Sequence, residues 1–321
     1  MPNDQKGELK CVLKGKKSFL EWLVTRLYRP HGIIPPHITP FTLSGDVDDD
    51  ALRKNVDFWV EAGVHGLATC ASNGEAIYMN NEERKTVLKT VLDQANGRVP
   101  VIAGTGGPST RDAIVQTRIA KDLGADAALV VTPYFLPPKQ EEILEYYRNI
   151  VESVDLPIIL YNVPKFTTVN METWVVSKLT EHGCVVGVKD SSGDMRQMQA
   201  LLSLASDRFS VLSGSGNLVF PNLASGGQGG IVAVANVVPS KCVQIYEKAI
   251  AGDFKEAGKI QSEIVILNDF LTKQFGVPAI KAALDLMGLE GGYPRKPLLP
   301  LNDKVKEELR RILCSLKVEL V

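Results

Sequence analysis

The chain reads Pro157-Ile158-Ile159-Leu160-Tyr161 and, beyond a helical pattern at Met171–Glu181, Val185-Val186-Gly187-Val188-Lys189. Both runs are almost entirely apolar, as parallel strands covered on both faces require. A strand, a helix and a second strand in this order are typical of a βαβ unit, whose two strands lie parallel. This stretch therefore predicts a parallel sheet with helices packed against it.

The same alternation extends in both directions from about Gly32. The other strand candidates are Ile33–Thr39, Gly66–Cys70, Val99–Ala103, Ala127–Thr132, Ser210–Ser213 and Gly230–Ala235. Amphipathic patterns between them predict helices at Ala51–Ala62, Asn81–Gln94, Thr110–Leu123, Glu141–Val151, Met195–Ala205 and Leu218–Ala224. Repeated β/α units at intervals of roughly 20 to 35 residues have the rhythm of a (β/α)8 TIM barrel. A doubly wound open sheet is the alternative, because periodicity alone does not show closure.

We divide the chain into a barrel at residues 32–240 and flanking segments on either side. Residues 241–321 carry helical patterns only, at Lys241–Ala251, Lys255–Phe275, Pro278–Met287 and Asp303–Leu316, which we expect to pack on the barrel. Residues 1–31 form a basic extension with an apolar stripe at Phe19–Val24. We interpret the extension as a helical appendage. A mitochondrial presequence is the alternative, although presequences are richer in Ser and Arg and poorer in acids.

Composition excludes several classes of partner. The 321 residues carry a formal net charge of -1, which leaves no electrostatic footprint for nucleic acid or for an anionic membrane surface. No apolar run is long enough to cross a bilayer. The cysteines are scattered and odd in number, which indicates reduced thiols in a cytoplasmic protein: Cys11, Cys70, Cys184, Cys242 and Cys314.

Lys189 is the residue that carries chemistry in this pattern. Functional side chains of a TIM barrel project from the carboxyl ends of its strands, and Lys189 ends an apolar strand. An ammonium there loses hydration, which favours the free amine that attacks a carbonyl carbon. The alternative is a strand-end lysine whose head group simply reaches into water.

Two neighbouring features strengthen that interpretation. Tyr161 ends the preceding strand, where a phenol could transfer protons, although a buried tyrosine is more often structural. The turn Ser72-Asn73-Gly74-Glu75 follows the second strand, and small polar residues around a glycine form a nest of N–H groups that can bind a carboxylate. Together they predict a site for a 2-oxo acid.

These segments together resemble the dihydrodipicolinate synthase / N-acetylneuraminate lyase family of class I, pyruvate-dependent aldolases. The resemblance runs from about Gly32 to about Pro300. Its matching motifs include Ile38-Thr39-Pro40-Phe41, Asn73-Gly74-Glu75, Ala103-Gly104-Thr105-Gly106, Val131-Thr132-Pro133-Tyr134, Tyr161-Asn162-Val163-Pro164 and Gly276-Val277-Pro278-Ala279-Ile280-Lys281. Ser-Asn before Gly-Glu is similar to the branch of 4-hydroxy-2-oxoglutarate and 2-keto-3-deoxy-acid aldolases.

The resemblance implies residue roles. Lys189 corresponds to the lysine that forms the Schiff base, and Tyr161 to the proton-transfer tyrosine. Ser72 and Asn73 fall where the family binds the substrate carboxylate, with Ser72 keeping a hydroxyl for the proton relay. The backbone near Val232 falls where the family closes over the ketoacid. The family also implies no cofactor, no metal and a homotetramer built from two tight dimers.

Two departures bear on the substrate. The family's lysine-pathway synthases read Tyr-Asn-x-Pro-x-Arg-Thr, and their arginine holds the second substrate's carboxylate, whereas this chain has Phe166 at that position. Lys165 would compensate only partly, because its side chain should point elsewhere. Phe135 stands where the family has a tyrosine that reaches the neighbouring subunit's site, so the relay between subunits is altered or absent.

We therefore predict a Schiff-base aldolase that cleaves a 4-hydroxy-2-oxo (2-keto-3-deoxy) acid to pyruvate and an aldehyde. The alternative is a 4-hydroxy-tetrahydrodipicolinate synthase, which condenses pyruvate with aspartate semialdehyde. A class II metal enzyme is disfavoured because no histidines show ligand spacing. Gly214-Ser215-Gly216 follows the seventh strand, where barrels often bind phosphate, so a phosphorylated substrate stays an alternative. The acidic cluster Asp46–Asp50 directly precedes the predicted helix at Ala51, and we interpret it as a helix cap. A catalytically inactive sensor remains the non-enzyme alternative.

Overall fold

The computed structural model describes residues 28–321. Residues 1–27 lie outside the described part, and the predicted helical appendage at residues 1–31 falls almost wholly within them. Within residues 28–321, no helix is long and apolar enough to span a membrane. Four cysteines lie in this part, and none forms a disulfide there.

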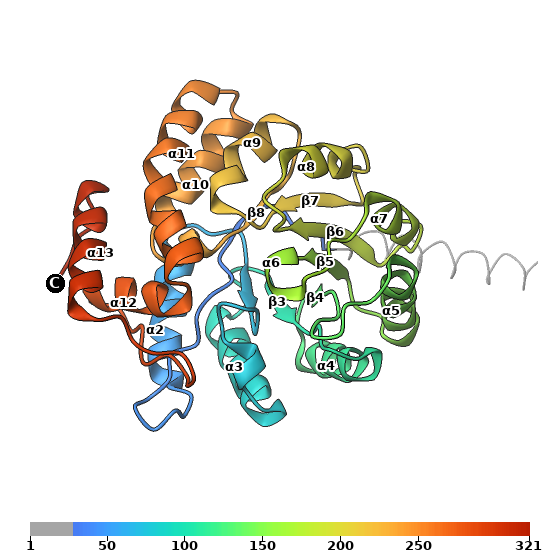
Figure 1. The fold of residues 1–321 in the computed structure, drawn as a ribbon, viewed down its shortest axis with the longest axis horizontal. Helices are drawn as coiled ribbons and strands as arrows, with labels where there is room; N and C mark the ends of the chain where they lie inside the picture. Colours follow the sequence, from blue (N-terminus) through green and yellow to red (C-terminus); the bar gives the residue numbers. More distant parts are fainter. Residues whose placement is uncertain (1–27) are drawn as a thin grey trace, which may run out of the picture.

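Eight parallel strands form the centre of the molecule (Figure 1). They are β1 (Gly32–Ile34), β2 (Leu67–Thr69), β3 (Val101–Gly104), β4 (Ala127–Val131), β5 (Ile158–Asn162), β6 (Val185–Asp190), β7 (Ser210–Ser213) and β8 (Gly229–Ile231). Strand β1 pairs with β8, and the residues just after β1 reach β2 through a bridge between Pro36 and Ala68. There His37 N–H donates to the Ala68 carbonyl at 3.1 Å. The sheet thus closes, the TIM-barrel prediction is confirmed, and the open-sheet alternative is wrong.

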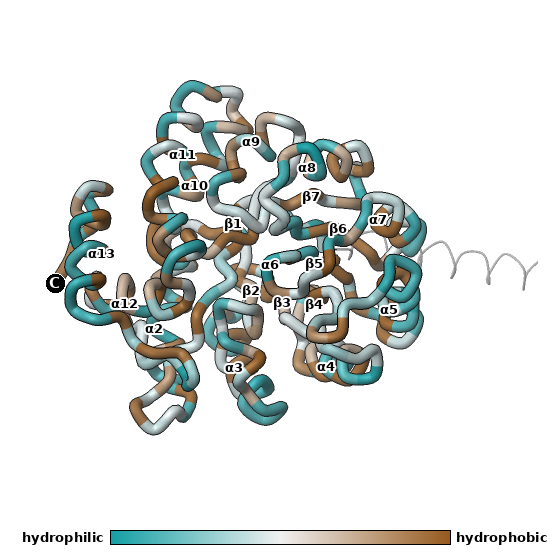
Figure 2. The backbone as a smooth tube through the Cα atoms, viewed as in Figure 1, coloured by the Kyte–Doolittle hydropathy of each residue, from teal (hydrophilic) through white to brown (hydrophobic). Residues whose placement is uncertain are grey.

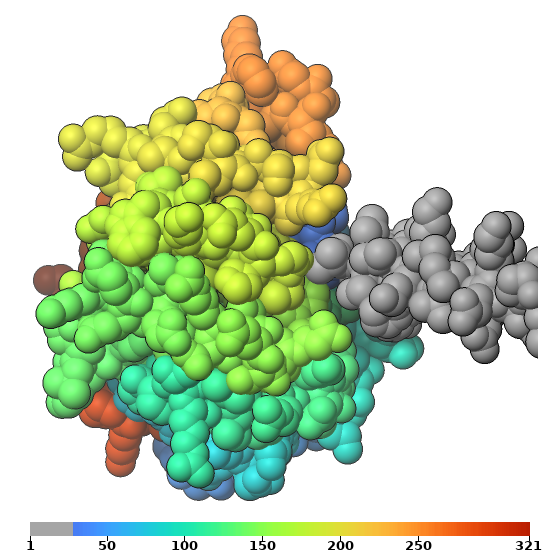
Figure 3. Space-filling view, turned by 90° about the vertical axis from the view of Figure 1, so that its right-hand side faces the viewer, coloured from blue at the N-terminus to red at the C-terminus, as the bar shows by residue number. Residues whose placement is uncertain are grey.

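Helices surround the barrel in chain order. They are α2 (Asp49–Glu61), α3 (Asn81–Ala95), α4 (Thr110–Leu123), α5 (Gln140–Ser153), α7 (Thr173–Leu179), α8 (Met195–Leu202), α9 (Val219–Ala224) and α10 (Pro239–Ile250). Figure 3 shows this succession on one side of the molecule, where the colours run in sequence order from teal to yellow. Asp48 caps α2 by accepting from Ala51 N–H at 3.0 Å. The interpretation of the acidic cluster Asp46–Asp50 as a helix cap is confirmed by Asp48.

Apolar side chains fill two separate cores, and the strands contribute to both; Figure 2 shows brown, hydrophobic segments at the centre of the molecule. The inner core fills the barrel with one side chain or more from every strand, including Ile34, Ala68, Ile102, Leu129, Ile159, Val186, Leu212 and Ile231. The outer core lies between strands and helices. Burial on both faces explains why the strands read as continuous apolar runs.

The C-terminal helices pack beside the barrel, next to α2 (Figure 1). They are α11 (Phe254–Asp269), α12 (Val277–Leu286) and α13 (Asp303–Ser315). The predicted helical segment Lys255–Phe275 is confirmed, with a change of type at its end, because α11 continues into a π-helical turn, η4 (Phe270–Gln274). Asn55 on α2 donates to the Glu290 carbonyl at 2.7 Å, which ties this region to the barrel.

The first and last strands are shorter than predicted because a buried asparagine replaces their backbone pairing. Asn236 is the last residue of the 3-10 turn η3 (Ala233–Asn236). This turn replaces the second half of the predicted strand Gly230–Ala235. Its side chain accepts from Ile38 N–H at 3.1 Å and donates to the Pro36 carbonyl at 3.2 Å. The chain after Ile34 is therefore held by this amide side chain together with the single bridge to β2, and not by a longer strand ladder.

A register shift between β5 and β6 sets the orientation of Lys189. Ile158 pairs with Val185, but Ile159 pairs with Gly187, so β6 carries one extra residue. Val186 points into the barrel and Val188 points outward to the helices. Simple alternation from Val186 would have turned Val188 inward and Lys189 outward. The bulge instead pairs Lys189 with Tyr161, whose side chain is in the inner core.

Gly187 allows this shift, because a side chain there would collide with the next strand. A Cβ added at Gly187 would lie 2.8 Å from the Ser210 carbonyl oxygen. We expect Gly187→Ala to lower the free energy of unfolding by about 1–3 kcal/mol, as overpacking does. Gly183→Ala is the matched control, since no atom lies within 4 Å of its added Cβ. Urea denaturation of the two variants tests this, and equal midpoints would contradict it.

Candidate active site

A cavity of about 460 Å³ opens at the carboxyl ends of the strands. Its lining comes from the ends of β2 to β5, from α6 (Pro164–Thr167) and from the start of α12. Most of its lining is apolar or aromatic. The lining includes Cys70, Ser72, Glu75, Arg84, Tyr134, Tyr161, Phe166, Phe275 and Val277.

Lys189 and Tyr161 stand side by side near the carboxyl ends of β6 and β5, and Tyr161 connects the pair to this cavity. They are direct partners on β6 and β5, and the Lys189 Nζ lies 4.0 Å from the Tyr161 ring centroid. Tyr161 lines the cavity, whereas Lys189 is 2% exposed. Among residues 28–321, no carboxylate forms an ion pair with Lys189. The structure thus brings together an amine and a phenol that the sequence predicted as neighbours.

The turn after β2 supplies free backbone donors beside them. Ser72 lines the cavity and is exposed, while Asn73 is half-buried and does not reach the lining. Within residues 28–321, the N–H groups of Ser72, Asn73 and Gly74 donate to no protein acceptor, whereas Glu75 N–H donates to the Ser72 carbonyl at 3.1 Å. A row of unused N–H groups can bind a carboxylate.

Val232 lies apart from the cavity. It is fully buried, its N–H donates to the Ile34 carbonyl at 3.2 Å, and its own carbonyl accepts from Ala235 N–H at 3.2 Å. Its backbone groups are therefore already paired within the barrel. A direct role for Val232 in closing over a ketoacid stays a prediction.

Sequence reasoning missed a polar network behind Lys189. Asp190 is buried and accepts from Asn162 Nδ2 at 2.7 Å and from Gln197 Nε2 at 3.0 Å. Burial raises the pKa of the Asp190 carboxyl, and these hydrogen bonds oppose the rise. Asn162 also accepts from Met171 N–H at 2.9 Å. The network fixes the ends of β5 and β6, and the strand-final Asn162 and Asp190 were its sequence signal.

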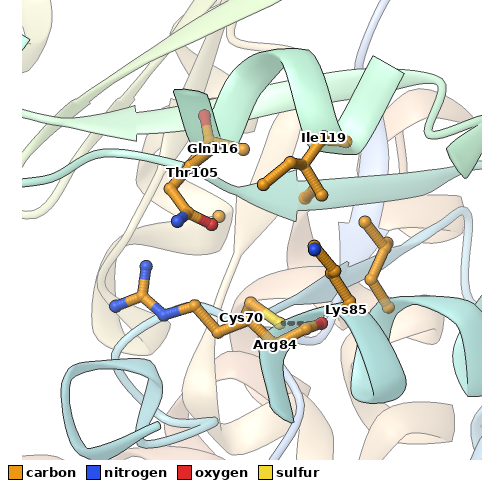
Figure 4. Close-up of a pocket in the computed structure, with 10 residues that line it drawn as sticks. Cys70, Arg84, Lys85, Thr105, Gln116 and Ile119 are labelled. Atoms are coloured by element: carbon orange, nitrogen blue, oxygen red, sulfur yellow. Dashed lines mark hydrogen bonds between the residues drawn. The ribbon is translucent and has the colours of Figure 1, made fainter. Parts of the chain in front are cut away.

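Cys70, at the end of β2, is not a candidate nucleophile. Figure 4 shows its sulfur directed toward the Arg84 carbonyl, 3.6 Å away, beside a small void between α3 and α4. That void, of about 10 Å³, is near the size of one water molecule. Burial raises the pKa of the Cys70 thiol to about 11, so the thiol stays protonated at neutral pH.

Phe166 forms part of the cavity wall. It is the residue that stands where the motif of the lysine-pathway synthases has an arginine. It lies on α6 and is 60% exposed. Lys165 points elsewhere, because its Nζ donates to the Thr272 carbonyl at 2.8 Å on η4. Arg84 is the only cationic side chain that lines the cavity within residues 28–321, and its Nε and Nη2 both donate to the Ala76 carbonyl.

The glycines Gly214 and Gly216, which left a phosphate site open, are closely packed. A Cβ at Gly214 would meet the Ser191 hydroxyl, and one at Gly216 would meet the Asn268 side chain. Packing therefore accounts for both glycines. Within residues 28–321, no group of three or more His, Cys, Asp or Glu side chains is placed to hold a metal ion.

The sequence as a whole is similar to that of a known protein family. The model of the dihydrodipicolinate synthetase family matches residues 29–316. The chain belongs to this family. Members of this family are Schiff-base lyases and synthases, and this chain is a carbon–carbon lyase of the same pyruvate-dependent class.

Two curated relatives in the family carry the synthase name. A 4-hydroxy-tetrahydrodipicolinate synthase of Methanopyrus kandleri is 40% identical over 292 residues, which cover 90% of this chain and 97% of the relative. One of Pelobacter propionicus is 38% identical and covers 88% and 98%. The names are those of the synthase, and not of the aldolase branch that the motifs resemble.

Solved structures in the family agree with the barrel. The dihydrodipicolinate synthase of Acinetobacter baumannii complexed with pyruvate is 37% identical, with a TM-score of 0.87, and covers 90% of this chain and 99% of its own. YagE, a prophage protein of the family from E. coli K12 in complex with pyruvate, is 30% identical, with a TM-score of 0.86 and coverages of 90% and 99%.

Proposed function

We propose that this chain cleaves a 4-hydroxy-2-oxo acid to pyruvate and an aldehyde through a Schiff base on Lys189. The observation that carries the proposal is the position of Lys189, buried and 4.0 Å from the ring of Tyr161, with Phe166 in the cavity wall. The aldehyde side of the cavity is therefore apolar.

The proposed reaction uses few groups. The Lys189 amine attacks C2 of the oxo acid and expels water, and the resulting iminium accepts the electron pair released when the C3–C4 bond breaks. Tyr161 takes the proton of the C4 hydroxyl and returns one to C3. The free N–H groups of the Ser72–Gly74 turn hold the carboxylate, and the Ser72 hydroxyl serves the proton relay. Water then hydrolyses the iminium and releases pyruvate.

Phe166 determines the choice of aldehyde in this proposal. A second carboxylate in the cavity would meet a phenyl ring on α6, while Lys165 is engaged with Thr272 and Arg84 with Ala76. An unpaired carboxylate loses a charge-assisted contact that contributes about 1.5–3 kcal/mol. Phe275 and Val277 extend the apolar wall on the facing segment.

Synthesis of 4-hydroxy-tetrahydrodipicolinate from pyruvate and aspartate semialdehyde is the second candidate. The names of relatives that are 40% and 38% identical favour it over the cleavage reaction. The two candidates share the steps at Lys189 and differ in the second substrate only. Phe166 is thus the residue on which a choice between them rests.

Covalent chemistry at Lys189 is tested by trapping. Pyruvate with borohydride should add a reduced pyruvyl group to the peptide that contains Lys189, as peptide mass spectrometry will show, and Lys189→Ala should lose both the adduct and turnover. A chelator should leave both unchanged in the unmodified protein. An adduct on another lysine, or a requirement for metal, would remove the proposal.

Substrate choice is tested at Phe166. Phe166→Arg should raise kcat/KM for aspartate semialdehyde by roughly tenfold to a hundredfold, because it restores a charge-assisted partner. It should not improve the release of pyruvate from 4-hydroxy-2-oxo acids. Phe166→Leu keeps the apolar wall and serves as the control. If the unmodified protein already condensed the semialdehyde as efficiently as a dedicated synthase, the second candidate would replace the first.

We further propose a homotetramer of two tight dimers, with Tyr134 and Phe135 near the tight interface. Phe135 is 91% exposed at a φ of 75°, and Leu136 beside it is 77% exposed. An apolar pair held out in this strained conformation is typical of a contact surface. Sedimentation equilibrium should give a tetramer, and Phe135→Asp should yield smaller species. A fully active monomer in the unmodified protein would refute this assembly.

A further inference from the structure

A buried ion pair between Glu75 and Lys281 holds the end of the Ser72–Glu75 turn. The Glu75 and Lys281 side chains are each 1% exposed, and Lys281 Nζ lies 2.6 Å from Glu75 Oε1. Lys281 belongs to α12, in the C-terminal helical region. Its ammonium also donates to the Tyr293 carbonyl at 2.6 Å and lies 4.5 Å from the Phe41 ring centroid.

The other oxygen of Glu75 is held as well. Glu75 Oε2 accepts from Arg295 N–H at 2.8 Å. The Arg295 guanidinium lies 4.1 Å from the Phe41 ring centroid. It also donates to both carboxylate oxygens of Glu83, at 2.7 and 2.9 Å. Both oxygens of the Glu75 carboxylate thus have partners from the C-terminal region.

Glu75 connects this network to the cavity. It lines the cavity, and it adopts a left-handed conformation, with a φ of 56°, at the end of the turn. Non-glycine residues occupy this region only where surrounding contacts hold them. The side-chain contacts of Glu75 therefore fix the backbone of the turn that exposes the N–H groups of Ser72, Asn73 and Gly74.

We infer that Lys281 is a positioning residue for the carboxylate of the 2-oxo acid. Its ammonium holds Glu75, and Glu75 holds the Ser72–Glu75 turn in the shape that presents its free N–H groups to the substrate. This role rests on the proposed function, since the turn must bind a carboxylate. It assigns a task in the site to a lysine outside the cavity lining, on a helix beyond the barrel.

The charges around Lys281 make the role sensitive to pH. Burial lowers the pKa of Lys281 to about 8, the carboxylates of Glu75 and Asp285 oppose that fall, and Arg295 adds to it. The ammonium is present below about pH 8 and is lost above it. The ion pair with Glu75 is therefore complete at neutral pH and weakens in alkaline solution.

Trapping of the pyruvate adduct on Lys189 at graded pyruvate concentrations tests the role. At pH 7, Lys281→Met should raise the half-saturating pyruvate concentration at least tenfold, while labelling at saturation reaches the level of the unmodified protein. Lys54→Met is the matched control: its 2.8 Å ion pair with Glu290 joins α2 to the same C-terminal region, away from the turn, and half-saturation should not change. Unchanged half-saturation in Lys281→Met would overturn the inference.

A double variant separates positioning from folding. Lys281→Met leaves Glu75 charged and buried, which can unfold the protein, whereas Lys281→Met with Glu75→Gln leaves no buried charge at that position. If positioning is the role, the double variant folds and still needs at least tenfold more pyruvate. If it folds and binds pyruvate as the unmodified protein does, the pair is merely structural and the inference fails.

The pH profile gives a third, independent readout. The ratio of half-saturating concentrations, double variant to unmodified protein, cancels every effect of pH that the two proteins share. That ratio should fall toward one between pH 7 and pH 9.5, as the unmodified protein loses its own ammonium. A constant ratio would overturn the inference. Absence of any adduct on Lys189 in the unmodified protein would instead refute the proposed function.

Discussion

The register of β6 against β5 is the constraint on which the site depends. One extra residue near Val186 reverses the alternation of the strand, so that Val188 faces the helices and Lys189 faces the barrel interior beside Tyr161. Gly187 lets the shifted strand approach Ser210 closely enough for pairing with β7 to continue. Bulges are known to redirect side chains next to active sites. A slip of one residue would pair Tyr161 with Val188 and leave the amine outside.

Sequence reasoning reached the barrel and the reactive pair because both depend on local order. Apolar runs locate strands, amphipathic runs locate helices, and strand ends locate functional groups, which is how Lys189 and Tyr161 were predicted together. Reasoning from periodicity could not show the bulge, since Val185–Val188 reads as an ordinary strand whether or not it slips. The early end of β1 was equally hidden, because it depends on Asn236, an amide far along the chain.

The sequence did not reveal which buried charged residues pair with each other across the fold. Glu75 was noticed as part of a polar turn, and Lys281 as part of a family motif, but nothing in either segment tells that the two meet. Buried charges find partners through tertiary structure, and a sequence gives the charge without the partner. The same holds for Asp190, whose hydrogen bonds to Asn162 and Gln197 come from different elements. The structure places the predicted Lys189 and Tyr161 side by side, and it adds buried residues around the site that the sequence did not point to.

Lys189 and Lys281, the two lysines that are buried within residues 28–321, differ in the partners of their ammonium groups. Lys281 lies 2.6 Å from a carboxylate that is itself fixed, so its nitrogen is occupied and cannot approach a carbonyl carbon. Lys189, almost equally buried, faces an aromatic ring at 4.0 Å and forms no ion pair within residues 28–321. The carboxylate of the adjacent Asp190 is engaged elsewhere, because it accepts hydrogen bonds from Asn162, Gln197 and Ser192. Burial is common to both lysines, so it is the absence of a carboxylate partner and the neighbouring Tyr161 ring that support the role proposed for Lys189.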